Sequence, residues 1–283
     1  MIVTQIKLKN WKNFRSVSTD LRERTFIVGP NASGKSNFID VFRFLRDVVR
    51  GSGGGGLSKA LEAREGIKAI RCFAARKDTR IEIDVTLAED SSSKMKWRYV
   101  LGLKNEGKGS NRDLVSYEKI YDENDELILD RPDKKDKEDP ERLTQTHLEQ
   151  VNSNYGFREI ADFFSGVTYL HLVPQLLKYA DQMGGYRLEG DPFGQGFLER
   201  VASVSERTRL SRLRRINEAL RICVPQLRDL KFKKDEITGR PHLEALYEHW
   251  RKDAGWQSES QFSDGTLRLL GLIWSLLDGD SLL

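Results

Sequence analysis

An eight-residue stretch near the N-terminus constrains the fold more than any other part of the chain. Gly29-Pro-Asn-Ala-Ser-Gly-Lys-Ser36 has the Gly-x-x-x-x-Gly-Lys-Ser spacing of a phosphate-binding P-loop. Such a loop works between a strand and a helix, because the helix N-terminus adds positive potential to the N–H groups of the loop. An apolar run at 25–28 precedes the stretch, and apolar residues recur at helical spacing over 38–49. The sequence therefore predicts strand, loop and helix in that order, within an α/β domain.

The residues of this loop have separate chemical tasks. Gly29 and Gly34 let the backbone turn so that successive N–H groups point into one concavity. Lys35 is predicted to reach the β- and γ-phosphates of a nucleotide, and the Ser36 hydroxyl to coordinate Mg²⁺. An ordinary glycine turn into a helix is the alternative, but it needs neither the Lys-Ser pair nor this spacing. The predicted nucleotide-binding set is Gly29, Pro30, Asn31, Ala32, Ser33, Gly34, Lys35, Ser36 and Asn37.

A second stretch near the other end of the chain also places glycine and serine at a predicted helix start. In Gln261-Phe-Ser-Asp-Gly-Thr-Leu-Arg-Leu-Leu270, Ser263 and Gly265 precede a run with apolar residues at helical spacing. Ser263 and Asp264 are common helix-capping residue types, so a plain cap is one interpretation. A second anion site is the other, because helix N-termini bind anions.

Together with Lys9-Asn-Trp-Lys-Asn-Phe-Arg-Ser16, these two stretches resemble the RecF/SMC-like ABC ATPases, in particular the bacterial AAA-type ATPases grouped near the OLD family. The resemblance extends over nearly the whole chain. It implies a P-loop ABC-type ATPase head of the α/β class, with an antiparallel β lobe and a helical lobe. In that family two heads close over two ATP molecules, and the serine-glycine signature of one head contacts the γ-phosphate held by the other. The expected cofactors are therefore ATP and Mg²⁺.

The resemblance also assigns individual residues. Lys35 and Ser36 become contacts to ATP in the same head, whereas Ser263 and Gly265 become contacts across the dimer, with Lys35 and Ser263 expected to act in catalysis. Arg15 matches a position from which these heads often help to bind nucleotide, although an exposed arginine at a strand end is an alternative. Gln175 is the candidate for the glutamine that senses Mg²⁺ and water, but its surroundings depart from the family pattern.

The end of the chain departs from the family pattern as well. In the family, an apolar strand that ends in adjacent acidic residues follows the signature helix, and those acids hold Mg²⁺ and polarise water. This chain ends at Asp278-Gly-Asp-Ser-Leu-Leu283, so we expect a head that lacks its C-terminal part. ATP binding is thus the firmer expectation, and hydrolysis requires acids from the full-length chain or from a partner. The alternative is a hydrolysis-deficient, ATP-responsive scaffold or nucleic-acid-binding module.

Between the two motifs, four segments have strand character and predict an antiparallel sheet: 67–74, 80–87, 96–103, and 115–121 leading to 127–129. The charged tract 132–140 is expected to be a solvated loop. Residues 206–224 predict a helix whose apolar face carries Leu210, Leu213, Ile216, Leu220 and Cys223 and whose other positions hold six arginines. A strand pair is expected at 227–232 and 243–247. One composite head results, with lobes at 1–131, 132–225 and 226–283.

Composition limits the kinds of partner and the compartment that we expect for this chain. The formal charge of +4 is small for 283 residues, so any nucleic-acid surface must be local, and the arginine-rich helix is either such a surface or a solvated face. The longest apolar stretch, 269–277, is too short to span a bilayer, and the first residues lack the apolar core of a signal peptide, so we expect neither export nor membrane insertion. Two distant cysteines fit a reducing cytoplasm. We expect a cytoplasmic protein that pairs with itself or a related ATPase head, in DNA maintenance or phage defence, with DNA and a nuclease domain or partner nearby.

Overall fold

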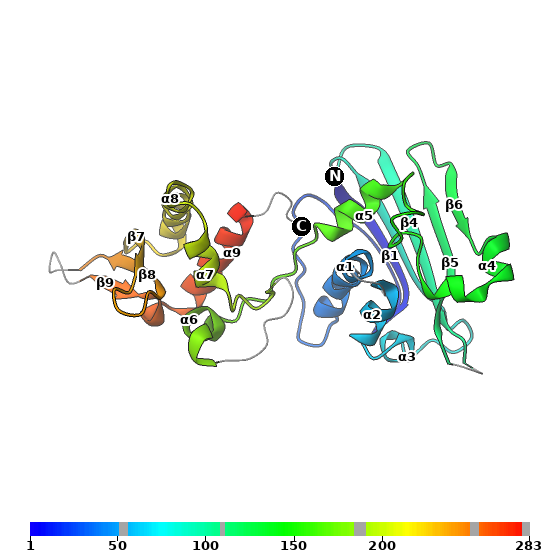
Figure 1. Cartoon of the computed structure of the whole chain (residues 1–283), viewed down its shortest axis with the longest axis horizontal. Coiled ribbons are helices and arrows are strands. Elements are labelled where there is room, and N and C mark those ends of the chain that lie inside the picture. The colour runs from blue at the N-terminus through cyan, green and yellow to red at the C-terminus, as the bar shows by residue number, and fades with distance from the viewer. Residues whose placement is uncertain (51–55, 108–110, 184–190, 250–254, 279–283) are drawn as a thin grey trace. The chain divides into compact units, whose positions relative to one another are not determined.

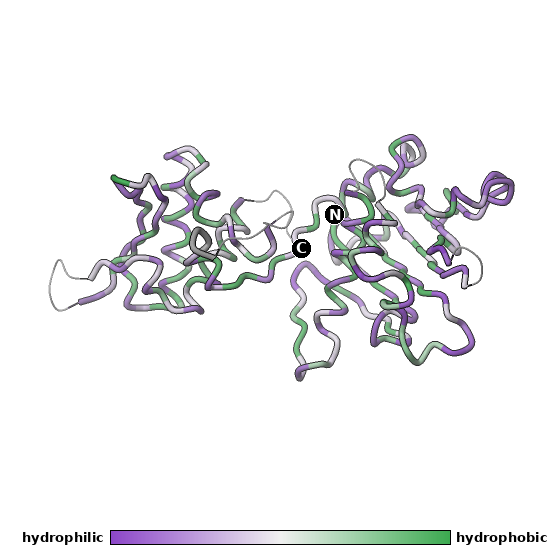
Figure 2. Tube along the Cα trace, turned by 60° about the horizontal axis from the view of Figure 1, so that its bottom comes forward, coloured by the Kyte–Doolittle hydropathy of each residue, from purple (hydrophilic) through white to green (hydrophobic). Residues whose placement is uncertain are grey.

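The computed structural model describes residues 1–50, 56–107, 111–183, 191–249 and 255–278 (Figure 1). The chain divides into two compact units, the first over Met1–Val167 and the second beginning at Thr168. Each unit has its own hydrophobic core. In Figure 2, hydrophobic and hydrophilic stretches alternate along the tube in both units.

The first unit is built on a six-stranded antiparallel sheet with the order β2-β1-β3-β4-β5-β6. Its strands are β1 (Ile2–Trp11), β2 (Phe14–Asp20), β3 (Ile81–Ala88), β4 (Met95–Asn105), β5 (Asp113–Tyr121) and β6 (Leu127–Arg131). The central strand β3 alternates Ile81, Ile83, Val85 and Leu87 into the core, with each of these side chains fully buried. The predicted antiparallel sheet is therefore present in this unit.

Helices pack against this sheet to complete the first core. They are α1 (Lys35–Val49), α2 (Gly56–Glu62), α3 (Ile67–Ile70) and α5 (Arg158–Ser165), and α4 (Lys134–Glu138) and a 3₁₀ turn (Pro140–Thr144) lie between β6 and α5. Helix α1 buries Val41, Phe44 and Leu45 at helical spacing, and the Phe44 ring lies 5.4 Å from that of Trp11 on β1. Packing on β1 thus fixes the helix that follows the P-loop.

Within its described residues, the second unit combines a three-stranded antiparallel sheet with four helices. The sheet order is β7-β8-β9, formed by β7 (Leu227–Lys234), β8 (Pro241–Tyr247) and β9 (Trp256–Ser258). The helices are α6 (Pro174–Met183), α7 (Phe197–Ser203), α8 (Glu206–Cys223) and α9 (Asp264–Asp278), with a 3₁₀ turn at Glu259–Gln261. The core includes Phe197, Ile216, Leu243 and Trp274. None of the helices in the described ranges is long and apolar enough to cross a bilayer.

Two predicted strands are wrong. Residues 25–28 form no strand, and Phe26 and Val28 are 88% and 91% exposed. A strand requires a neighbour for its hydrogen-bond ladder, and none of the described strands pairs with this segment. Residues 67–74 form helix α3 followed by a loop, because Ile67 and Ile70 are spaced to bury together on one turn of helix.

Two other predictions need correction in detail. Leu213, Ile216 and Leu220 of α8 are buried as predicted, but Leu210 is 59% exposed at a cavity and Cys223, the last residue of the helix, is exposed. The charged tract 132–140 is not uniformly solvated. It forms α4, whose cap residue Asp133 accepts a hydrogen bond from the backbone of Asp136 at 2.8 Å, and the Asp136 side chain is buried.

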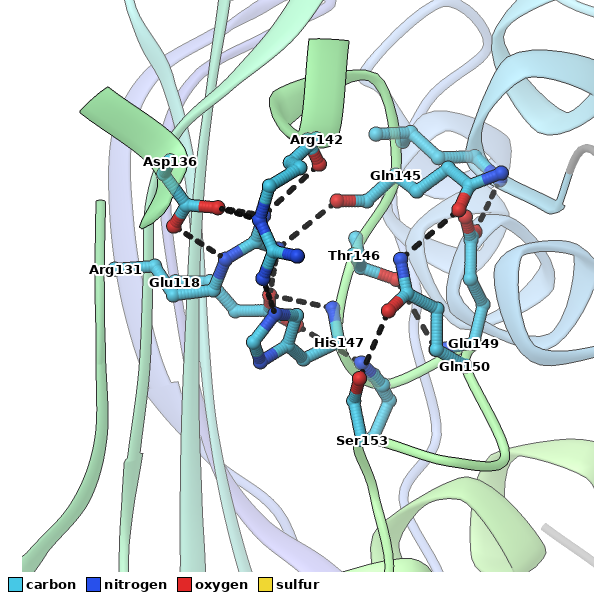
Figure 3. A network of polar contacts seen from close by, with 12 residues as sticks. Glu118, Arg131, Asp136, Arg142, Gln145, Thr146, His147, Glu149, Gln150 and Ser153 are labelled. Carbon is cyan, nitrogen blue, oxygen red and sulfur yellow. Dashed lines mark hydrogen bonds and ion pairs between the residues drawn. The ribbon is translucent and has the colours of Figure 1, made fainter. Parts of the chain in front are cut away.

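The reason for this burial is an ion network around Arg131, at the end of β6 (Figure 3). The Arg131 guanidinium lies 3.0 Å from Glu118 and 2.9 Å from Asp136, and none of the three side chains is exposed. Its remaining N–H groups donate to the carbonyls of Arg142 and Gln145, both at 2.9 Å. Burial opposes ionisation of Asp136, but Arg131, the Asp133 N–H and Arg142 together outweigh it and hold the pKa of this carboxyl well below its usual range.

Removal of Arg131 should therefore leave buried Glu118 without a counter-charge and leave Asp136 paired only with Arg142, at 3.1 Å. We expect Arg131→Met to lower the free energy of unfolding by about 3–5 kcal/mol, measured by urea denaturation. Lys119→Met, which breaks only the exposed pair with Asp130, is the matched control and should cost less than about 1 kcal/mol. Equal losses in the two variants would contradict the role given to Arg131.

Glu149 is a buried carboxyl with a different environment. Its Oε2 accepts a hydrogen bond from the Leu57 N–H at the start of α2, at 2.6 Å, while its Oε1 is buried without a partner in the described residues. Burial, together with the nearby charge of Glu118, raises the pKa of Glu149 to about 7. The ionised form is thus disfavoured in the folded protein.

The sign of the resulting pH dependence follows from this raised pKa. In the unfolded chain Glu149 ionises near 4.5, so wild-type stability falls as the pH rises from there to about 7. We expect the free energy of unfolding of Glu149→Gln to rise relative to that of the wild type over this range, by up to about 3 kcal/mol. Thermal unfolding at several pH values measures the difference. Glu123→Gln, at an exposed turn, should show no such change, and a flat profile for Glu149→Gln would contradict the interpretation.

Candidate nucleotide-binding site

The P-loop lies between the exposed segment 25–28 and the start of α1. Within it, the Ser33 N–H donates to the Pro30 carbonyl at 3.3 Å, and Ala32 has a positive φ of 63°. Gly34 precedes the helix with a φ of 100°, a conformation that favours glycine, and its carbonyl accepts the Phe38 N–H at 2.9 Å. Gly34 is buried, whereas residues 29–33 and Ser36 are exposed. The loop therefore presents its outer surface and the helix start to a ligand.

The turn between β1 and β2 packs directly against the P-loop. A Cβ atom on Gly34 would lie 2.3 Å from the Asn13 side-chain nitrogen and 2.9 Å from the Phe14 ring, so no larger residue fits. Asn37 donates from its amide to Asn13 at 2.8 Å, and the Trp11 indole N–H donates to the Asn37 carbonyl at 2.8 Å. The structure thus brings the β1–β2 turn and the P-loop together, and the Asn37 side chain points toward Asn13.

Lys35 follows Gly34 as the first residue of α1. Its Nζ donates to the carbonyls of Gly29 and Pro30, at 2.8 and 2.7 Å. The ammonium group is consequently folded over the loop, where the phosphates of a nucleotide would lie. The Ser36 hydroxyl is exposed beside it, and a hydroxyl of this kind is a suitable oxygen ligand for Mg²⁺.

A cavity of about 560 Å³ lies beside Asn13 and Asn37, although none of residues 29–36 lines it, and sequence reasoning missed most of its lining. Asn13 and Asn37 line its near side, and Lys12 and Arg64 contribute cations. Asp40 lies between these cations, 2.7 Å from Lys12 and 2.9 Å from Arg64. Burial works against ionisation here too, yet Arg64 and Lys12 lower the pKa of Asp40 below its usual value. Of the three charged residues Lys12, Asp40 and Arg64, only Lys12 could have been suspected, because it lies within the stretch that resembles the family.

Arg15 is exposed on β2 and borders a different hollow of about 820 Å³, together with Phe73 and Lys77. The other predicted residues belong to the second unit. Gln175 is exposed in the first turn of α6.

Ser263 immediately precedes α9. Its Oγ accepts the Thr266 N–H at 3.1 Å, as a helix cap does, and both Ser263 and Gly265 are exposed. A Cβ on Gly265 would meet only the Ser263 hydroxyl, at 3.9 Å, so the helix start is open. The same Oγ lies 2.8 Å from the Thr266 hydroxyl, so both side-chain hydrogen bonds of Ser263 are made within the first turn of α9, and the residue stays exposed.

Comparison with known proteins identifies the family. The model described as "AAA domain, putative AbiEii toxin, Type IV TA system" matches residues 24–283. The chain belongs to this family. The match includes both the P-loop and Ser263-Asp-Gly265 of the AAA domain. The predicted AAA-type ATPase family and the mixed α/β fold with an antiparallel sheet are confirmed, whereas the SMC-like head and the relation to the OLD family stay predictions.

The individual proteins that resemble this chain match it either over a short segment or at low sequence identity. Over 42 residues the chain is 50% identical to the chromosome partition protein Smc of Methanocaldococcus jannaschii. This matched segment makes up 14% of this chain and 4% of that protein. An SMC head bound to the C-winged helix domain of ScpA is 15% identical, with a TM-score of 0.46 over 97% of this chain and 75% of that one. A structure from work on ATP-driven dimerization and DNA-stimulated activation of SMC ATPases is also 15% identical, with a TM-score of 0.30 over 74% and 95%.

The close approach at Gly34 generates a prediction about binding. Gly34→Ala forces a side chain into the left-handed region and against Asn13, so the loop must distort. We expect affinity for a fluorescent ATP analogue to fall by about tenfold or more, since the backbone cost alone is about 1–2 kcal/mol. Gly156→Ala, where a Cβ would meet open space, should leave affinity unchanged. Normal binding by Gly34→Ala would show that the loop tolerates the clash.

Proposed function

We propose that this AAA domain binds ATP with Mg²⁺ as one head of an SMC-like ATPase. The backbone of residues 29–34 would surround the phosphates, Lys35 would contact the β- and γ-phosphates, and the Ser36 hydroxyl would hold Mg²⁺. The observation that carries this proposal is the loop itself, because Gly34, Asn13 and α1 hold it in a defined shape. The adjoining cavity of about 560 Å³ is large enough for the nucleoside.

We further propose that a second head, a copy of this chain or a related one, completes the site. The open start of α9 would contact the γ-phosphate of ATP bound to that second head through Ser263 and Gly265. The exposure of both residues supports this role, since a buried cap could not reach another molecule. ATP would then act as a link between heads, because each head binds a different side of the same nucleotide. Arg15 and Gln175 are secondary candidates for contacts in the closed form.

For the wider role we propose DNA maintenance or defence against phage, with chemical work on DNA carried out by a nuclease domain or partner. The family description, which names a putative toxin of a toxin–antitoxin system, supports the defence role in particular. In either setting the head would supply a nucleotide-dependent change of association, which is a common way to couple ATP to a second activity.

Two substitutions should separate nucleotide binding from head association. We expect Lys35→Ala to weaken binding of the ATP analogue by about 10- to 150-fold, because a charge-assisted contact of about 1.5–3 kcal/mol is lost. Ser263→Arg should bind the analogue normally, yet fail to associate. Sedimentation with and without a saturating, non-hydrolysable ATP analogue and Mg²⁺ measures association.

Controls keep these outcomes distinct. Lys104→Ala on β4 and Ser211→Arg on α8 change exposed residues of the same types and should behave as the wild type. If the wild-type mass is the same with and without saturating nucleotide, the dimer proposal fails, whereas loss of binding in Lys104→Ala would remove the specific role of Lys35.

A further inference from the structure

A fully exposed aromatic ring lies at the tip of a tight turn in the first unit. Phe73 is 100% exposed, although its neighbour Cys72 is buried. The Ala75 N–H donates to the Cys72 carbonyl at 3.0 Å and closes the turn, and the Cys72 N–H donates to the Asn10 carbonyl at 2.9 Å. The turn is therefore attached to the end of β1, and its backbone holds the phenyl ring out toward water.

The hollow of about 820 Å³ beside Phe73 is strongly basic. Arg15, Arg76 and Lys77 line it, and within the described part of the chain none of the three forms an ion pair or a side-chain hydrogen bond. Lys9 is different, because it pairs with Asp78 at 2.8 Å. Three cations thus face the hollow without a protein counter-charge.

The wall of this hollow is rigid. Asn10 is 3% exposed, and its amide donates to the carbonyls of Asp78 and Arg80 at 2.9 and 2.8 Å. Asp78 also accepts from the Arg80 side chain, and this contact, followed by that from Lys9, holds the pKa of Asp78 well below its usual range. The segment after the turn is consequently fixed in place, so a ligand would lose little binding free energy to ordering it.

We propose that this hollow binds single-stranded nucleic acid, with a base stacked on Phe73 and the backbone phosphates held by Arg15, Arg76 and Lys77. Sequence-tolerant recognition of single strands combines a basic groove with an aromatic face in this way. A duplex is a poorer match, because its bases are stacked on one another and offer no free face to the ring. A free nucleotide shares the same chemistry, but a strand is the better match, since three unpaired cations exceed what one phosphate group requires and suit successive backbone phosphates.

This inference does not rest on the proposed ATP-dependent association. Phe73 also reaches the cavity beside the P-loop, so the experiment must distinguish the strand from ATP. The probe is a fluorescein-labelled oligothymidylate of about 15 nucleotides, near the upper site size of a single-strand-binding domain. Fluorescence anisotropy measures its affinity at several salt concentrations, and the labelled ATP analogue is titrated in parallel.

We expect Phe73→Ala to weaken oligothymidylate binding by about 5- to 150-fold and Phe73→Trp to retain it, because stacking on one base is lost and restored. The double change Arg76→Glu with Lys77→Glu should weaken binding further and reduce its salt dependence. Lys94→Glu, an exposed lysine that does not line the hollow, is the control and should bind normally. Lys35→Ala should also bind the strand normally, even where it no longer binds ATP.

Three results would overturn the proposal. Unchanged oligothymidylate affinity in Phe73→Ala is the first, and a duplex that binds as tightly as the strand is the second. The third is a loss of ATP affinity in Phe73→Ala as large as its loss of strand affinity, because that result would place Phe73 against the base of ATP.

Discussion

The close approach of Gly34 to Asn13 is the contact on which the nucleotide site depends. A side chain on the residue before α1 would collide with Asn13 and Phe14, so the P-loop packs closely on the β1–β2 turn only because Gly34 has none. Asn13 then engages Asn37, and Trp11 engages the backbone of the same helix. The loop shape is therefore set by tertiary contacts from the sheet as well as by its own glycines.

Much of the local structure could be predicted from the sequence, because it follows from residues that are neighbours in the chain. The helix after the P-loop, the antiparallel strands β3 to β6 and the start of α9 all have periodicity or caps that are readable locally. The segment 25–28 shows the limit of this reasoning. Its apolar residues have strand character, but a strand forms only where a partner is available for its hydrogen bonds, and no local pattern reveals the partner.

The same distinction applies to the functional surfaces. The P-loop residues are contiguous, so their spacing alone identified them, whereas Arg64 and Phe73 reach their cavities through the packing of α2 and of the turn after α3. Arg131, Glu118 and Asp136 are a further example, since charged residues in a polar tract are expected at the surface. Their burial follows from mutual pairing across the sheet and α4, and a single sequence does not show such pairs.

The end of β1 and the turn that follows it contact the residues of both hollows in the first unit. Asn10 holds the Phe73 turn and the segment after it, Trp11 holds α1, and Asn13 holds the P-loop. A substitution in this strand end would consequently disturb two surfaces at once, and its phenotype in a genetic screen would not reveal which surface had mattered. Separation-of-function alleles should instead be sought among residues that reach only one of the two hollows.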